Sequence, residues 1–129
     1  MELFISDLDG TLLNGNAEVT EFTRDTLNRL MAKGLNFTAA TARTLASAGK
    51  ILSGLDLKLP VILMNGVLIY DMAEKKYVKI NSLSGELCGL IIGLSKGLGL
   101  EPFIYSVSDN QLFTRYERLI SPAMESFYN

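Results

Sequence analysis

The sequence lacks histidine and tryptophan, has a single cysteine, and has no large excess of either charge. Without histidine, the chain offers no serine–histidine or cysteine–histidine pair, no histidine zinc site and no histidine proton shuttle. The lone Cys88 cannot form a disulfide within the chain, which fits a reducing cytoplasm, and it cannot build a thiolate metal site. Chemistry must therefore rest on carboxylates, hydroxyls, amides or lysine, a set of groups that suits a hard cation such as Mg²⁺.

Further absences concern the setting of the protein. The net charge of −2 gives no basic surface for nucleic acid or for an anionic membrane. No apolar run is long enough to span a bilayer, and the first residues lack the basic start of a signal peptide. We expect a cytoplasmic protein with no nucleic-acid and no membrane partner. Its 129 residues suit one domain, or a domain plus part of a second.

The first 81 residues alternate between strand and helix patterns. Short apolar runs predict strands at residues 3–6, 35–39 and 61–64. Periodic segments between them predict helices at 21–33 and 45–53. This β-α-β-α-β order predicts an α/β fold with a parallel, doubly wound, Rossmann-like sheet and right-handed crossovers. In the first helix, Thr20 is the expected N-cap, Gly34 the stop, and the expected buried side chains are Phe22, Leu27, Leu30 and Met31.

The pattern changes after the third strand. Residues 67–70 and 77–80 flank a charged stretch and predict a β-hairpin. A glycine-dotted apolar helix then follows at 84–96, with strands at 101–107 and 111–116. We expect residues 1–81 to form one unit and 82–129 to open a second α/β unit, of which 121–129 are weakly patterned.

Two aspartates follow the first predicted strand. Ligands of open parallel sheets bind beyond the carboxyl ends of the strands, so Asp7 belongs at that edge and Asp9 lies on the turn after it. Gly10 relieves steric demand on this turn, and Thr11 adds a hydroxyl that can hold it. Backbone N–H groups of the turn, which also includes Leu8, can face an anion.

Two other interpretations of these aspartates do not involve catalysis. Asp-Gly is a common turn pair, and an aspartate after a strand often caps a loop. A calcium loop is the second alternative, because Asp7, Asp9, Thr11 and Glu18 have suitable spacing. It fails because the position that needs glycine is Leu12 and because a strand precedes the loop instead of a helix.

The segment Asp7-Leu8-Asp9-Gly10-Thr11-Leu12 after an N-terminal strand resembles the first motif of the haloacid dehalogenase superfamily. The resemblance implies that Asp7 is a nucleophile that forms an aspartyl-phosphate and binds Mg²⁺. It implies that Asp9 is the acid/base group and also a metal ligand through its main-chain carbonyl.

The ends of the next two strands resemble the same superfamily. Ala40-Thr41-Ala42-Arg43 is similar to the Ala-Thr-Gly-Arg form of the Cof-type branch, with Ala42 in place of glycine. Thr41 is then the phosphate-contacting hydroxyl, and Ala42 and Arg43 lie near phosphate or substrate. Asn65-Gly66 resembles the Cof-type Glu-Asn-Gly segment with Met64 in place of the acid. Asn65 and Gly66 are thereby expected to orient the substrate, although a plain Asn-Gly turn is the other interpretation.

The resemblance spans essentially the whole chain and has a consequence for activity. It identifies residues 1–81 as the N-terminal half of the catalytic core and 82–129 as the beginning of an inserted α/β cap of type IIB. The family's lysine and acidic pair come after the cap, so the sequence is interpreted as truncated. Losing those groups costs on the order of several kcal/mol of transition-state stabilisation.

Two functional hypotheses follow. The first is a Mg²⁺-dependent phosphatase of small phosphorylated metabolites such as sugar phosphates, weakly active or inactive as this chain, with phosphomutase activity left open. The second is a non-catalytic module that self-associates, or complements another chain, through the apolar edge of its first strand. A homodimer through that sheet edge is the expected assembly.

Overall fold

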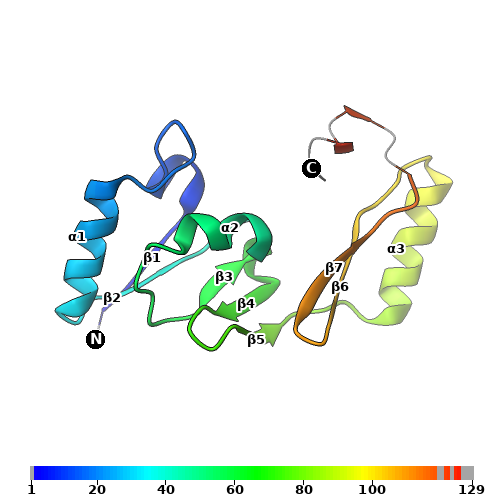
Figure 1. The fold of residues 1–129 in the computed structure, drawn as a ribbon. Helices are drawn as coiled ribbons and strands as arrows, with labels where there is room; N and C mark the ends of the chain where they lie inside the picture. The colour runs from blue at the N-terminus through cyan, green and yellow to red at the C-terminus, as the bar shows by residue number, and fades with distance from the viewer. Residues whose placement is uncertain (1, 119–120, 123, 126–129) are drawn as a thin grey trace. The chain divides into compact units, whose positions relative to one another are not determined.

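The structure is a computed structural model that describes residues 2–118, 121–122 and 124–125. The chain divides into two compact units, Met1–Ser82 and Leu83–Asn129 (Figure 1). The interpretation of these units as half of a catalytic core and the start of a cap stays a prediction. Part of the weakly patterned stretch 121–129 lies outside the described residues.

The first unit contains the parallel strands that the sequence predicts. Strand β1 (Leu3–Ser6) pairs in parallel with β2 (Asn36–Ala39). Strand β3 (Val61–Leu63) joins β2 through a parallel bridge between Ala40 and Ile62. Helices α1 (Glu21–Ala32) and α2 (Leu45–Leu52) connect the strands. This arrangement confirms the predicted β-α-β-α-β order.

Helix α1 has the predicted ends but only part of the predicted buried face. The Thr20 side chain accepts a hydrogen bond from the Thr23 N–H and caps the helix. The prediction that Phe22 and Leu30 point inward is wrong, because these residues are 80% and 41% exposed. The more protected stripe runs through Thr23, Leu27 and Met31 at four-residue spacing. Phe22, one residue earlier, is rotated about 100° away from that stripe.

The core of the first unit lies around β2, β3 and α2. Its largest fully buried side chains are those of Leu8, Leu52, Val61, Leu63 and Leu68. Burying each such side chain contributes roughly 1.5–3 kcal/mol relative to exposure.

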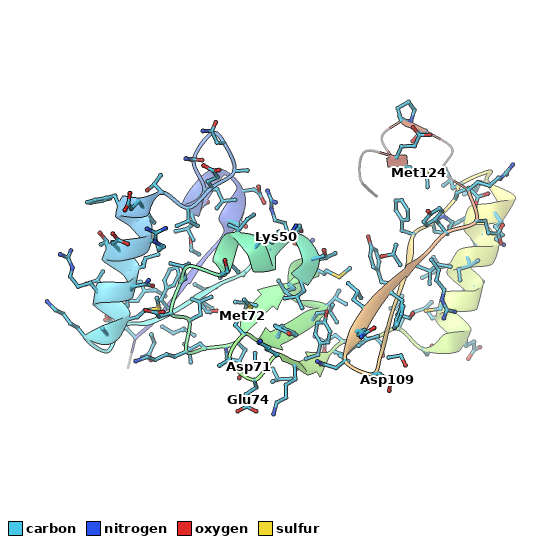
Figure 2. All side chains as sticks on the ribbon, in the orientation of Figure 1. Lys50, Asp71, Met72, Glu74, Asp109 and Met124 are labelled. Atoms are coloured by element: carbon cyan, nitrogen blue, oxygen red, sulfur yellow. The ribbon has the colours of Figure 1, made fainter. Side chains whose placement is uncertain are left out.

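A hairpin follows β3, as predicted. Strand β4 (Leu68–Asp71) runs antiparallel to β3 and to β5 (Lys76–Ile80). The carboxylate of Asp71 accepts hydrogen bonds from the N–H groups of Ala73 and Glu74, both at 2.9 Å, and so holds the turn. Figure 2 labels Asp71 and Glu74 at this turn.

Strand β1 has one partner strand among the described residues, and that partner is β2. Leu3, Phe4 and Ile5 are each about half exposed. Consecutive residues of a strand point to opposite faces, so both faces of β1 are apolar and partly open. Such a pattern is typical of a strand that is buried inside a parallel sheet.

The second unit is a helix followed by a hairpin. Helix α3 (Gly85–Gly97) begins at Ser84, whose hydroxyl accepts from the Leu87 N–H. Strands β6 (Ile104–Ser108) and β7 (Gln111–Arg115) pair antiparallel, so the first of these strands begins three residues later than predicted. Figure 1 draws α3 next to the β6–β7 hairpin. No described helix is long and apolar enough to cross a membrane.

Candidate active site

The turn after β1 fixes the position of Asp7. The Asp7 Oδ1 accepts a hydrogen bond of 2.7 Å from the N–H of Leu8. The Leu8 side chain is fully buried and anchors the turn in the core. The following turn, η1 (Leu8–Leu12), is closed by a 3.0 Å bond from the Leu13 N–H to the Leu8 carbonyl. Gly10 has a φ of +75°, which favours glycine at this position.

A cavity of about 440 Å³ opens at the carboxyl ends of the parallel strands. This volume is in the range of small-molecule sites. Predicted site residues from the ends of β1, β2 and β3 meet in it: Asp7, Asp9, Thr41, Ala42, Asn65 and Gly66. The sequence reasoning missed Ala40 and Ile62, which also line it and whose only signal is their place at neighbouring strand ends. The lining does not include four other predicted residues, namely Leu8, Gly10, Thr11 and Arg43.

Thr41 lines this cavity and is only 4% exposed. Its N–H donates to the Ile62 carbonyl at 2.9 Å, and its hydroxyl oxygen accepts from the Arg43 N–H at 3.2 Å. Its carbonyl accepts from the Asn65 N–H at 3.1 Å. These bonds hold the loops after β2 and β3 together and fix the hydroxyl of Thr41 at the carboxyl edge of the sheet.

The backbone after β3 adopts an uncommon conformation at the cavity. Turn η2 (Met64–Gly66) has φ values of 50° at Met64, 55° at Asn65 and 90° at Gly66. Non-glycine residues seldom adopt positive φ, and asparagine is among those that do so most readily. The Asn81 side chain donates to the Gly66 carbonyl at 2.8 Å and helps to hold the turn. Strained backbone of this kind is concentrated at functional sites.

Asp9 and Arg43 form an ion pair that the sequence reasoning did not predict. The Arg43 Nε lies 2.8 Å from Asp9 Oδ2, and the Arg43 Nη2 lies 2.6 Å from Asp9 Oδ1. This two-bond geometry is the strong form of arginine–carboxylate pairing. Hydrogen bonding from Arg43 lowers the pKa of the Asp9 carboxyl, and bonding to Asp9 raises the pKa of Arg43. The sequence does contain a signal for this pair, because an acidic residue follows β1 and a basic residue follows the adjacent strand β2.

The oxygen atoms near the cavity are of the type that Mg²⁺ prefers. Candidates are the carboxylate of Asp7 and the main-chain carbonyl of Asp9, while the Asp9 carboxylate is held by Arg43. Within the described part of the chain, no three or more acidic, histidine or cysteine side chains are grouped so that they could hold a metal ion. The donor chemistry therefore fits Mg²⁺, but the described donors are few.

The geometry first defines a broad class: α/β proteins whose ligand site lies at the carboxyl edge of a parallel sheet, with aspartates and a hydroxyl at successive strand ends. The family is more specific. A family model described as haloacid dehalogenase-like hydrolase matches residues 4–127. The chain belongs to this family, which confirms the resemblance read from Asp7–Leu12.

Known proteins agree with this assignment. The protein named "Putative phosphatase MG265" from Mycoplasma genitalium is 34% identical over 115 residues, which are 88% of this chain and 41% of that protein. The structure of TM0651 from Thermotoga maritima has a TM-score of 0.71 and 25% identity, over 97% of this chain and 45% of that one.

A third match is the subclass IIB sugar phosphatase BT4131, with a TM-score of 0.59 and 21% identity. It covers 87% of this chain and 43% of that one, and at this identity it supports the fold alone. The chain thus spans less than half the length of each of these proteins.

Proposed function

We propose that the chain carries the nucleophile-bearing part of a Mg²⁺-dependent phosphatase of small phosphorylated metabolites, sugar phosphates among them. The observation that supports this most is the meeting of Asp7, Asp9 and Thr41 in one cavity. The curated relative from Mycoplasma genitalium is named a putative phosphatase, which supports hydrolysis of a phosphate ester.

The chemistry proceeds in two displacements. A carboxylate oxygen of Asp7 attacks phosphorus, the ester P–O bond breaks, and Asp9 gives a proton to the leaving oxygen. Asp9 then takes a proton from water as the water oxygen attacks the aspartyl-phosphate and releases inorganic phosphate. The Thr41 hydroxyl donates a hydrogen bond to a phosphoryl oxygen. Mg²⁺ held by the Asp7 carboxylate and the Asp9 carbonyl would supply positive charge that reduces the repulsion between carboxylate and phosphate.

Arg43 must release Asp9 during this cycle. A carboxylate that accepts two hydrogen bonds from a guanidinium is held in its ionised form. A general acid must instead be protonated when the leaving group departs. We therefore interpret the Asp9–Arg43 pair as the resting arrangement of the site.

The test is hydrolysis of p-nitrophenyl phosphate with Mg²⁺ by the chain as it stands. We expect a slow rate that Asp7→Asn abolishes, because the amide cannot act as the nucleophile. Asp25→Asn is the matched control, since Asp25 is an exposed aspartate of α1 outside the cavity. Equal rates for the wild-type chain and Asp7→Asn would contradict the proposed role of Asp7.

A second candidate function is a non-catalytic module that self-associates or complements another chain. The observation that favours it is the half-exposed apolar edge strand β1, which has one partner strand among the described residues. Free edges of this kind pair readily with other strands.

Light scattering after size exclusion tests this alternative. If β1 edges pair, Ile5→Lys should lower the average mass, because a charge on the edge disfavours pairing. Ile80→Lys, at a similarly exposed isoleucine of β5, is the matched control. An unchanged mass for Ile5→Lys would exclude pairing through β1.

A further inference from the structure

Turn η2 needs support from its neighbours, because all three of its residues have positive φ and two of them, Met64 and Asn65, are not glycine. Backbone of this kind is unfavourable by itself and persists where the surrounding bonds enforce it. The turn also shapes the cavity, since Asn65 and Gly66 both line it. Whatever holds η2 therefore fixes part of the lining of the proposed phosphate site.

The loop after β2 holds the first two residues of the turn. The Met64 N–H donates to the Arg43 carbonyl, and the Asn65 N–H donates to the Thr41 carbonyl, both at 3.1 Å. A third bond, from the Val67 N–H to the Met64 carbonyl at 3.2 Å, closes the turn. None of these three bonds involves Gly66, so the last residue of the turn depends on a different partner.

Asn81 is that partner. Its side-chain nitrogen donates to the Gly66 carbonyl at 2.8 Å across 15 positions of sequence. Its backbone N–H donates to the Val67 carbonyl, also at 2.8 Å, and continues the β4–β5 pairing by one residue pair. The backbone bond keeps Asn81 beside the turn, so its amide group is already in place to bind the glycine carbonyl.

From these bonds we propose that Asn81 is a positioning residue for the site, because its amide holds η2 in the conformation that presents Asn65 and Gly66 to the ligand. Asn81 is itself exposed and is not among the described residues that line the cavity, so it acts on the site through the turn. Its effect on phosphate rests on the proposed function, whereas its hold on the turn does not.

The hold on the turn is tested by amide hydrogen exchange of the ¹⁵N-labelled full-length chain without ligand. Asn81→Ala removes the side-chain donor and keeps the backbone N–H. We expect the Asn65 and Val67 amides to exchange about fivefold faster, the factor that corresponds to one lost hydrogen bond. Unchanged exchange at both amides would overturn the proposal.

Asn28→Ala is the matched control. The Asn28 side-chain nitrogen also donates to a glycine carbonyl of the first unit, that of Gly54 at 3.0 Å, and neither residue lines the cavity. This variant should leave the exchange of the η2 amides unchanged. Faster exchange at η2 in Asn28→Ala as well would mean that any loss of stability opens the turn, which would overturn a specific role for Asn81.

The consequence for the ligand is tested by titrating the same three chains with inorganic phosphate and Mg²⁺. The phosphate dissociation constant should rise about threefold to tenfold in Asn81→Ala and stay unchanged in Asn28→Ala. Equal affinity of the wild-type chain and Asn81→Ala would overturn the positioning role. A wild-type chain that binds no phosphate would instead contradict the proposed function, and the exchange rates would still decide whether Asn81 holds the turn.

Discussion

At the scale of single residues, Thr38 and Thr41 show how one residue type serves two purposes. Both are 4% exposed and belong to the same strand region. The Thr38 hydroxyl donates to the Pro60 carbonyl at 2.7 Å and links β2 to the start of β3. The Thr41 hydroxyl lies at the cavity, where we propose that it contacts phosphate. The Thr38 hydroxyl thus has a structural role, and the role that we propose for the Thr41 hydroxyl is functional.

Replacing each threonine by valine separates these roles. Thr38→Val should lower the free energy of unfolding by about 1–3 kcal/mol, because the part-buried Pro60 carbonyl loses its donor. It should leave phosphate binding unchanged. Thr41→Val should weaken phosphate binding with a smaller loss of stability. Thermal unfolding and phosphate titration of both variants check this, and weakened phosphate binding in Thr38→Val alone would contradict it.

The Asp9–Arg43 pair predicts a pH effect. The folded-state pKa of Asp9 lies below its ordinary value of 3.8, so the pair stabilises the fold above that value and the contribution is lost as the pH falls through the lowered pKa. Arg43→Gln should raise the pKa of Asp9 toward 3.8. Carbon-13 NMR titration of the side-chain carboxyl measures it, with Arg118→Gln as the control. An unaltered Asp9 titration in Arg43→Gln would show that the pair does not form in solution.

Single residues also mark what the sequence could and could not predict about the site. Asp7, Asp9, Thr41 and Asn65 could be placed together, because each follows a strand and strand ends meet at one edge of a sheet. The Asp9–Arg43 hydrogen bonds could not be predicted. The two residues are 34 positions apart in the sequence, and the bonds depend on the rotamers of both side chains. Phe22 was placed wrongly because a one-residue change in the phase of a helix moves a side chain off the buried face.

At the scale of elements, Asn28 connects α1 to the loop before β3. Its amide nitrogen donates to the Gly54 carbonyl at 3.0 Å, and its amide oxygen accepts from the Asp56 N–H at 2.9 Å. One half-buried side chain therefore satisfies two backbone groups of the loop that follows α2.

This link gives a prediction for stability. Asn28→Ala should lower the free energy of unfolding by about 1–2 kcal/mol, because two hydrogen bonds are lost. Asn28→Asp should lose less, since the carboxylate still accepts from the Asp56 N–H. Urea denaturation of the two variants gives the comparison. Equal losses for both variants would mean that the bond to Asp56 contributes nothing.

Element boundaries were predictable to different degrees. β1 was predicted at its observed bounds, because Asp7 ends a clear apolar run. β6 begins at Ile104, although its predicted run began at Glu101, and apolar alternation alone does not reveal where backbone pairing starts. The exposure of α3 was not predicted, because periodicity reports that a face is apolar without reporting what covers it.

At the scale of the whole molecule, the described residues present a cavity of about 440 Å³ with few metal ligands. Mg²⁺ binding to the isolated chain should therefore be weak, with a dissociation constant on the order of millimolar or higher. Affinity for this ion rises with the number of oxygen ligands. Isothermal titration calorimetry checks this, with Asp7→Asn as the comparison. Micromolar affinity would show that the chain provides ligands beyond Asp7 and the Asp9 carbonyl.

The most direct test of the phosphate cavity is an NMR titration of the ¹⁵N-labelled chain with inorganic phosphate and Mg²⁺. We expect the largest amide shifts at residues 7–11, 41–43 and 65–66, and we expect Asp7→Asn and Thr41→Val to reduce them. The titration detects binding even when turnover is negligible. Shifts that are absent from these three segments, or that persist unchanged in both variants, would contradict the claim that Asp7, Asp9 and Thr41 form one phosphate site.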